Sequence, residues 1–276
     1  MLKKFTKMHG AGNDYIYFDC LQEEFPDPSG AAVRLSDRHK GIGGDGIVLI
    51  CPSKVADAKM RMFNADGSEG NMCGNAIRCV GKYLYDNGIV QKTELSIETK
   101  SGIKHLLLYI RDKKVERVRV DMGAAVFDPE AIPVRSSEKI IGKRTKVAGE
   151  EYEITCVSMG NPHCVLFLPP DGLDLEKIGP KFENDPLFPE RVNTEFIEKI
   201  GENALKMRVC ERGSGETMAC GTGACAAAAA ACACGVCDYG KDILVRLRGG
   251  DLVINVSDTV MMTGEAVTVF TGETEI

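Results

Sequence analysis

Hydrophobic and polar residues alternate with the two-residue period of β-strands along most of this chain. In the first half, this alternation and short apolar runs predict strands at residues 3–8, 15–19, 47–51, 59–64, 95–98, 103–110 and 115–121. In the second half they predict strands at residues 152–159, 163–168, 193–198, 205–209, 243–247, 252–256 and 260–270. The pattern indicates an α/β protein of the α+β type, rich in mainly antiparallel sheet.

Helical patterns are few. Short helices are predicted at residues 31–39 and 175–183, and a longer one at residues 75–86 that ends at Asn87-Gly88. The other long helix contains six consecutive alanines, from Ala226 to Ala231. Alanine is the strongest helix former, and a helix with almost no side chain beyond Cβ suits close burial within a curved sheet.

A glycine-rich loop that carries one cysteine precedes each of the two longer helices. Asp66-Gly-Ser-Glu-Gly-Asn-Met-Cys73-Gly-Asn and Arg212-Gly-Ser-Gly-Glu-Thr-Met-Ala-Cys220-Gly-Thr share a Gly-Ser step and a closing Cys-Gly. Both also place an acidic residue, Glu69 or Glu216, four positions before the cysteine. Gly12-Asn13-Asp14 and Gly160-Asn161-Pro162 precede the two cysteines at nearly equal distances. These shared landmarks predict two homologous halves.

A boundary between the halves is predicted after the strand that ends at Asp121, near Met122-Gly123. We therefore expect one domain of residues 1–121 plus 266–276, which carries Cys73, and a second of residues 122–265, which carries Cys220. Each is expected to be a curved sheet around a central helix, so that the two domains are pseudo-symmetric, with the active site in the cleft between them.

The two cysteines are the candidate reactive groups. A cysteine at a helix N-terminus lies among backbone N–H groups and the positive end of the helix dipole, which favour a thiolate. One thiol on each side of a cleft suits inversion at a carbon with an acidic hydrogen, where a thiolate removes the proton from one face and a thiol returns one to the other. The same helix N-termini could hold a carboxylate and stabilise the developing negative charge.

Composition narrows the classes of function. The 276 residues are 44% hydrophobic with a net charge of −6, and no basic patch with interleaved aromatics suggests nucleic acid. We expect no signal peptide in the N-terminal residues, and we expect the alanine-rich run to be too short and too weakly apolar to span a bilayer. We expect a cytoplasmic protein with no membrane association and with its twelve cysteines reduced.

Two other motifs invite alternative functions. The loop from Gly41 to Gly46 lacks the Lys-Ser/Thr and the following helix of a phosphate-binding P-loop. Cys232, Cys234 and Cys237 suggest a metal, but no second Cys-x-x-Cys or nearby histidine completes a four-ligand zinc site. No metal is therefore expected. The basic residues of the strands that enter the cysteine loops are expected to form solvated faces; these residues are Lys59, Arg61, Lys206 and Arg208.

At these motifs the chain resembles the diaminopimelate epimerases. The similarity covers nearly the whole sequence and includes Lys7-Met-His-Gly-Ala-Gly-Asn13-Asp14, Phe63-Asn-Ala-Asp-Gly-Ser-Glu69, Ser158-Met-Gly-Asn161-Pro-His163, Glu190-Arg-Val-Asn193 and Ala219-Cys220-Gly-Thr-Gly-Ala-Cys225. The resemblance implies a cofactor-independent isomerase that interconverts LL- and meso-2,6-diaminopimelate in lysine and peptidoglycan synthesis. It also implies independence of pyridoxal phosphate and metal, and a homodimer.

The resemblance also implies roles for individual residues. Cys73 and Cys220 would be the acid/base pair, with His163 and Glu211 tuning the thiols. Arg212 would pair with the distal carboxylate, and Glu211 could take an ammonium group. The remaining expected substrate contacts are Asn13, Asn64, Gly74, Asn75, Asn161, Asn193, Gly221 and Thr222, the glycines and their successors through backbone donors. Gly46 stands where some members carry a glutamine, so no side-chain contact is expected there.

The closest alternative is a related cofactor-independent racemase or epimerase that acts on proline or hydroxyproline. Arg212 and the set of asparagines argue against it, because a second amino acid centre needs polar partners that a proline ring does not.

Overall fold

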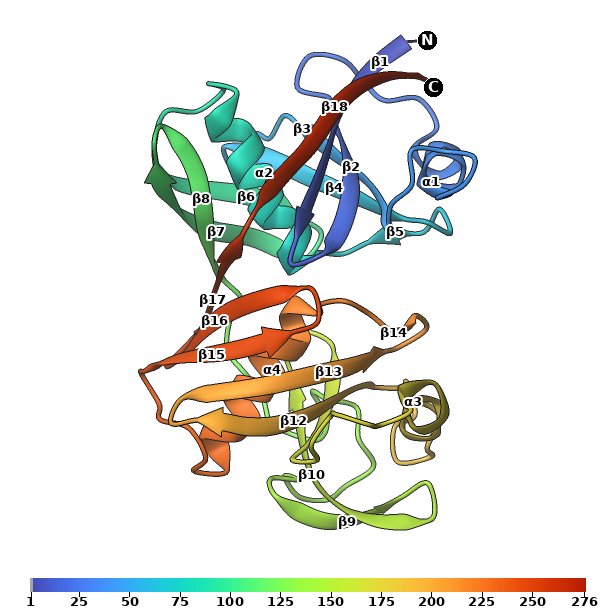
Figure 1. The fold of residues 1–276 in the computed structure, drawn as a ribbon, viewed down its shortest axis with the longest axis vertical. Coiled ribbons are helices and arrows are strands. Elements are labelled where there is room, and N and C mark those ends of the chain that lie inside the picture. The colour runs from blue at the N-terminus through green and yellow to red at the C-terminus, as the bar shows by residue number, and fades with distance from the viewer. Residues whose placement is uncertain (1) are drawn as a thin grey trace. The chain divides into compact units, whose positions relative to one another are not determined.

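The computed structural model describes residues 2–276, and its chain divides into two compact units (Figure 1). Unit 1 comprises the chain up to Asp121 together with Thr263–Ile276, and unit 2 comprises Met122–Met262. The chain thus returns to its first unit at the C-terminus, through the strands β17 (Val260–Glu265) and β18 (Val267–Glu275).

Unit 1 is built on one continuous series of strands. Its members in chain order are β1 (Leu2–Gly10), β2 (Asn13–Asp19), β3 (Gly46–Cys51), β4 (Ala58–Asn64), β5 (Glu69–Gly70), β6 (Glu94–Thr99), β7 (Gly102–Arg111) and β8 (Lys114–Asp121). β1 pairs antiparallel with both β18 and β2, and β2 then pairs parallel with β3. β4 is antiparallel to β3 and β5 and parallel to β6, and β6, β7 and β8 follow as antiparallel neighbours.

Unit 2 repeats this order of pairings. Its strands are β9 (Lys143–Val147), β10 (Glu150–Ser158), β11 (Pro162–Leu166), β12 (Asn193–Gly201), β13 (Ala204–Glu211), β14 (Gly215–Glu216), β15 (Asp242–Leu247) and β16 (Gly250–Val256). β10 and β11 are antiparallel, β11 and β12 parallel, β12 and β13 antiparallel, and β13 and β15 parallel, as in β1, β2, β3, β4 and β6. The repeat predicted from the two cysteine loops is therefore confirmed at the level of strand topology.

Helix α2 (Gly74–Asp86) is the central helix of unit 1 and packs against β1, β2, β7 and β8 (Figure 1). Ile77, Val80 and Leu84 are fully buried at helical spacing, whereas its last turn is partly exposed. Gly81 allows the closest approach, because a Cβ there would lie 2.9 Å from a methyl carbon of Leu106.

Helix α4 (Gly221–Ala233) is the central helix of unit 2 and packs against β10 to β13, β15 and β16. Ala226 to Ala231 are all fully buried, so every face of this segment contacts protein. A helix that is apolar all round belongs in an enclosed core. The prediction that the alanine run suits close burial is confirmed.

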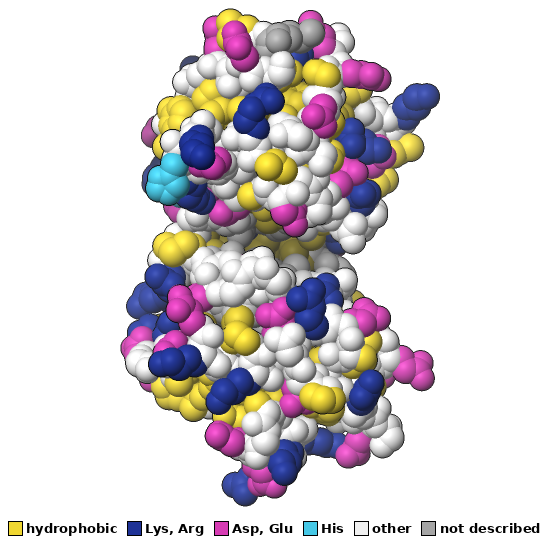
Figure 2. Space-filling model, turned by 90° about the vertical axis from the view of Figure 1, so that its right-hand side faces the viewer, with side chains coloured by type: hydrophobic (Ala, Val, Ile, Leu, Met, Phe, Trp, Pro, Cys, Tyr) yellow, Lys and Arg dark blue, Asp and Glu magenta, His cyan; other side chains and the backbone are white. Residues whose placement is uncertain are grey.

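Two shorter helices lie outside these cores. α1 (Pro28–Ser36) covers a cluster that includes Phe18, Leu49 and Phe63, and α3 (Leu175–Glu183) covers one that includes Phe182 and Phe196. Among residues 2–276, no helix has both the length and the apolar character needed to span a bilayer. Acidic and basic side chains are interspersed on the face shown in Figure 2.

Some predicted boundaries are wrong, for local reasons. The helix predicted at residues 31–39 begins three residues earlier, because Asp27 accepts a hydrogen bond from the Gly30 N–H at 3.0 Å and Pro28 opens the first turn. The strand predicted at 260–270 is two strands, β17 and β18, divided at Ala266. β9, whose sequence is Lys-Arg-Thr-Lys-Val, has too few apolar residues to be predicted from the hydrophobic pattern.

Candidate active site

Each of the two cysteines in the repeated loops is the N-cap residue of a central helix. Cys73 caps α2 in an extended conformation, and its sulfur accepts from the Ala76 N–H at 3.5 Å. Cys220 caps α4 in the same way, and its sulfur accepts from the Gly223 N–H at 3.3 Å. The prediction that both thiols lie at helix N-termini is confirmed. Cys73 is half-buried, whereas Cys220 is only 5% exposed.

An arginine–glutamate pair holds each cysteine loop to the strand that enters it. Arg61 Nε on β4 lies 2.8 Å from Glu69 Oε1, and Arg208 Nε on β13 lies 2.8 Å from Glu216 Oε1. The two glutamates are the acidic residues that recur four positions before each cysteine. The prediction that Arg61 and Arg208 simply form solvated faces is therefore wrong, because both are partly buried in these pairs.

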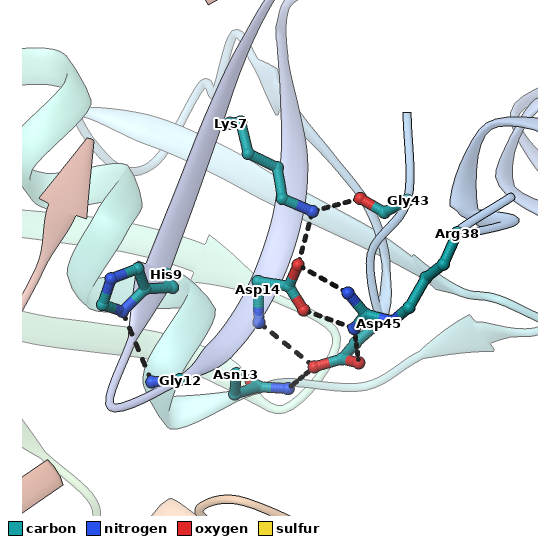
Figure 3. Close-up of polar contacts among 8 residues, drawn as sticks. All are labelled: Lys7, His9, Gly12, Asn13, Asp14, Arg38, Gly43 and Asp45. Carbon is teal, nitrogen blue, oxygen red and sulfur yellow. Dashed lines mark hydrogen bonds and ion pairs between the residues drawn. The ribbon is translucent and has the colours of Figure 1, made fainter. Parts of the chain in front are cut away.

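In unit 1, Asn13 contacts both the Cys73 sulfur and a charged network, and Figure 3 shows the network. The Cys73 thiol donates to Asn13 Oδ1 at 3.3 Å, and Asn13 Nδ2 donates to Asp45 Oδ2 at 2.6 Å. Because a carboxylate only accepts, Asp45 fixes the Asn13 amide with its nitrogen inward and its oxygen toward the thiol.

Further ion pairs fix the loop that carries Asn13 (Figure 3). Asp14 accepts from Lys7 at 2.5 Å and from Arg38 at 2.7 Å, and Arg38 also reaches Asp45 at 2.9 Å. Burial raises the pKa of Asp14, but hydrogen bonds and charges from Arg38 and Lys7 outweigh it, so the net pKa is lowered. At the turn itself, His9 Nδ1 accepts from the Gly12 N–H at 3.3 Å.

The other unit 1 residues predicted for the site lie at the start of α2 and at the end of β4. Gly74 and Asn75 form the first turn of α2 and are buried. Asn64 ends β4, where its Nδ2 donates to Ser68 Oγ at 3.0 Å and is half-buried. Gly46 cannot carry a side chain in this backbone, because a Cβ would lie 2.0 Å from the Phe63 carbonyl oxygen.

In unit 2, a series of polar contacts leads from the buried sheet to Cys220. Glu195 Oε1 lies 2.7 Å from His163 Nδ1, and His163 Nε2 lies 3.0 Å from Asn161 Oδ1. Asn161 Nδ2 donates to Thr222 Oγ1 at 3.4 Å, and Thr222 Oγ1 lies 3.4 Å from Cys220 Sγ. His163 and Glu195 are both fully buried.

Sequence reasoning missed Glu195. Its only signal is a charged residue within the otherwise apolar first part of β12, Asn-Thr-Glu-Phe-Ile, where every residue is buried. Asp45, which orients Asn13, is also absent from the predicted site, because nothing in the sequence of its glycine-rich loop relates it to Asn13.

The electrostatic setting of Cys220 differs from the one expected. Burial raises the pKa of the Cys220 thiol well above its usual range, and the nearby carboxylates of Glu211 and Glu195 raise it further. Hydrogen bonds from Thr222 and the Gly223 N–H oppose this rise without cancelling it. The helix N-terminus thus favours the Cys220 thiolate through the Gly223 N–H, as predicted, but burial and the two carboxylates outweigh this contribution.

Asn193, Glu211 and Arg212 lie close to this group at the ends of their strands. Asn193 Nδ2 donates to the Pro162 carbonyl at 2.8 Å, and its Oδ1 accepts from the Arg212 N–H at 3.0 Å. The Arg212 guanidinium donates to the Glu190 carbonyl at 2.8 Å. Glu211 Oε1 accepts from the Thr217 hydroxyl at 2.5 Å.

No disulfide joins any of the twelve cysteines, all of which lie within residues 2–276. Within the described chain, no three His, Cys, Asp or Glu side chains are grouped as metal ligands would be, Cys232, Cys234 and Cys237 included.

Solved structures at low sequence identity share this fold. A hydroxyproline epimerase from Agrobacterium vitis superimposes with a TM-score of 0.68 at 17% identity, over 99% of this chain and 92% of that one. A phenazine biosynthesis protein of the PhzF family from Bacillus anthracis gives a TM-score of 0.72 at 17% identity, over the full length of both. These likenesses establish the fold class, the mixed α/β architecture predicted from the sequence.

Similarity to curated proteins is much stronger. The profile of the family described as diaminopimelate epimerase matches residues 5–127 and 155–269. The diaminopimelate epimerase of Acetivibrio thermocellus is 54% identical over 99% of both chains. That of Methanococcus maripaludis is 51% identical over 99% of this chain and all of its own. Since the match extends over nearly the whole length and includes both cysteine loops, this chain belongs to the diaminopimelate epimerase family.

Proposed function

We propose that this protein is an isomerase that interconverts LL- and meso-2,6-diaminopimelate in lysine biosynthesis. The observation that carries the proposal is the repeated cysteine: Cys73 and Cys220 each cap the central helix of one of two homologous units. Membership of the diaminopimelate epimerase family supports the choice of substrate.

The reaction needs one base and one acid. As a thiolate, one of the two cysteines removes the α-hydrogen from one face of the reacting carbon, and the electron pair stays on that carbon and its carboxylate. The other cysteine, as a thiol, donates its proton to the opposite face, so the configuration is inverted. After one turnover the thiol and thiolate have exchanged places, and the reverse reaction uses them in the opposite order.

The raised pKa of Cys220 is consistent with a resting thiol in this scheme. Cys220 then supplies the proton in the direction of the reaction in which Cys73 is the base. Once Cys220 has given up its proton it is a thiolate. The hydrogen bonds that its sulfur accepts stabilise this negative charge.

The helix N-termini provide the electrophilic part of the site. Gly74, Asn75, Gly221 and Thr222 occupy the first turns of α2 and α4, where backbone N–H groups have no acceptor within the helix. We assign them to the α-carboxylate, where they stabilise the charge that develops when the proton leaves.

The remaining predicted residues are assigned to the substrate's polar groups. The side chains of Asn13, Asn64, Asn161 and Asn193 supply amide contacts. Arg212 pairs with the distal carboxylate, Glu211 takes an ammonium group, and His163 and Glu211 tune the thiol of Cys220.

The protein is also proposed to act as a cytoplasmic homodimer, without pyridoxal phosphate or a metal. Sedimentation analysis of the purified protein tests the dimer, with a single monomer species as the contrary result. If no cofactor is needed, the protein should keep full activity after treatment with a chelator, which removes metals, and with a carbonyl reagent, which reacts with pyridoxal phosphate.

The decisive assay follows exchange of the α-hydrogen with solvent, for diaminopimelate and for proline in parallel. We expect exchange and inversion with LL-diaminopimelate and none with L-proline or trans-4-hydroxy-L-proline. Exchange with the proline substrates alone would contradict the proposed substrate while leaving the two-thiol chemistry intact.

A further inference from the structure

His163 and Glu195 form a buried pair in unit 2, and this pair places a carboxyl group in the interior close to Cys220. Glu195 lies on β12 with its side chain directed at the first turn of α4, where a Cβ on Gly223 would lie 2.8 Å from Glu195 Oε1. Its second oxygen, Oε2, is buried without a hydrogen-bond partner among the described residues. Burial of this kind is unfavourable for a charged group and calls for a compensating role.

The hydrogen bonds of the series have a direction. Asn161 Oδ1 can only accept, so His163 Nε2, at 3.0 Å, carries a hydrogen and donates it. Asn161 Nδ2 in turn donates to Thr222 Oγ1, which leaves the Thr222 hydroxyl hydrogen free for the Cys220 sulfur at 3.4 Å. Each group donates toward Cys220, and chains of this kind strengthen one another.

Glu195 is the group that can set this direction. The 2.7 Å contact between Glu195 Oε1 and His163 Nδ1 contains one further hydrogen, shared between a carboxyl and a ring nitrogen. Wherever that hydrogen lies, His163 Nε2 keeps its own, and the pair has no net charge. Without a partner at Nδ1, the ring could place its single hydrogen there and present a bare Nε2 to Asn161, and the direction of the series would be lost.

We propose that Glu195 is a positioning residue for the reaction: through His163 and Asn161 it orients the Thr222 hydroxyl to donate to the sulfur of Cys220. The thiolate that Cys220 becomes on giving up its proton is thereby stabilised. The inference rests on the proposed acid/base role of Cys220, but the hydrogen-bond series itself lies wholly within unit 2.

The equivalent asparagine of unit 1, Asn13, meets Cys73 in the opposite orientation. There the asparagine oxygen faces the sulfur, so the Cys73 thiol is a donor, and the asparagine nitrogen is held by Asp45. The two asparagines at equivalent positions of the repeat thus present opposite ends of their amides toward their cysteines.

Glu195 can affect the pKa of the Cys220 thiol in two opposite ways, so the direction of the change in a variant distinguishes them. A carboxylate charge near the sulfur disfavours a thiolate, as does Glu211 on β13, whereas the oriented Thr222 hydroxyl favours it. Because the Glu195–His163 pair is neutral as a whole, the hydrogen-bond effect should prevail. Removal of Glu195 should therefore raise the pKa of the Cys220 thiol. If Glu195 acted only as a negative charge, its removal would instead lower that pKa.

The test measures the rate of iodoacetamide alkylation of Cys220 against pH, by mass spectrometry of its peptide. The full-length variants are Glu195→Leu, Glu195→Gln and Thr194→Val. In the wild type the alkylation rate rises with pH as the thiol ionises, and in Glu195→Leu this rise should occur about one pH unit higher. At any pH below the rise, alkylation of the variant should be about tenfold slower. Glu195→Gln can donate an amide hydrogen to His163 Nδ1 and keeps Nε2 protonated, so it should match the wild type.

Thr194→Val is the matched control, because it alters a fully buried side chain on the same strand but on its opposite face. The Thr194 hydroxyl has no hydrogen-bond partner within residues 2–276, so its loss should leave the alkylation profile unchanged. An unchanged or lower-pH profile in Glu195→Leu would overturn the proposal, as would a Glu195→Gln profile that matches Glu195→Leu.

If Glu195→Leu does not fold, nitrogen NMR of His163 provides the second measurement. We expect a protonated Nε2 in the wild type and in Glu195→Gln, and a bare Nε2 in the wild type would overturn the proposal. Neither readout requires turnover, so an absence of epimerase activity would count against the proposed function and not against this arrangement.

Discussion

Asn13 presents its side-chain oxygen to the Cys73 sulfur at 3.3 Å because its side-chain nitrogen is held 2.6 Å from Asp45. The amide cannot rotate by half a turn without placing its oxygen against a carboxylate. Asp45 is in turn held by Arg38, whose other partner is Asp14. One ion-pair network therefore fixes a polar group that contacts the first thiol.

Replacing Asp45 by alanine should lower kcat/KM by about tenfold, roughly the value of one charge-assisted hydrogen bond, because the Asn13 amide is then free to turn. Asp45→Asn should retain most of the activity, since its side-chain oxygen can still accept from Asn13. Steady-state kinetics test this, with Glu24→Ala, an exposed carboxylate of unit 1, as the control. Equal losses in Asp45→Ala and Asp45→Asn would show that orientation of the amide is not the cause.

Replacing either Cys73 or Cys220 by alanine should lower epimerisation at least about a hundredfold, because each face of the carbon needs its own proton carrier. The circular dichroism spectrum should not change. Cys232→Ala and Cys234→Ala are the controls and should affect stability alone. Near-normal turnover in Cys73→Ala or Cys220→Ala would remove that thiol from the mechanism.

Isotope incorporation tests the two-base mechanism directly. In D2O, early meso product formed from LL-diaminopimelate should contain deuterium at the inverted carbon, because the donating thiol exchanges with solvent before substrate binds. Recovered substrate should contain little deuterium. Mass spectrometry at low conversion distinguishes the alternatives, and product that retains protium at that carbon would indicate a single base.

Acid should weaken unit 1 through Asp14. Its folded-state pKa lies below that of the unfolded chain, so its contribution to stability is present at neutral pH and is lost as pH falls through the folded-state value. The free energy of unfolding should therefore decline below about pH 4, and less steeply in Asp14→Asn. Urea unfolding between pH 2 and pH 7 measures both slopes, and identical pH dependence in the two proteins would contradict the assignment.

The enclosed surroundings of α4 should make Ala228 intolerant of larger side chains. Ala228→Leu should reduce the free energy of unfolding by about 1–3 kcal/mol, because the added atoms have no free space. Lys181→Leu places the same side chain on the exposed face of α3 and should change stability by less than about 0.5 kcal/mol. Thermal denaturation compares the two variants with the unmodified protein. If Ala228→Leu were as stable as Lys181→Leu, the surroundings of α4 would have to contain unfilled space.

Much of the architecture could be read from the sequence. The two cysteine loops, with their Gly-Ser steps and acidic residues, predicted the internal repeat that the strand pairings confirm. Local signals are enough here, because a capped helix start and an apolar period depend on neighbouring residues. The alanine run predicted an enclosed helix for the same reason: no other environment suits a helix without a polar face.

Only the tertiary structure decided what surrounds each cysteine. The pKa of Cys220 depends on its burial and on Glu195 and Glu211, which lie on two different strands and have no local relation to the α4 sequence. Asp45 and Asn13 are likewise distant in the chain and meet because β2 and β3 pair in parallel. Sequence determined which groups this protein has at its two helix ends, whereas the packing of distant strands decided their orientation and charge, because electrostatic effects act through space and not along the chain.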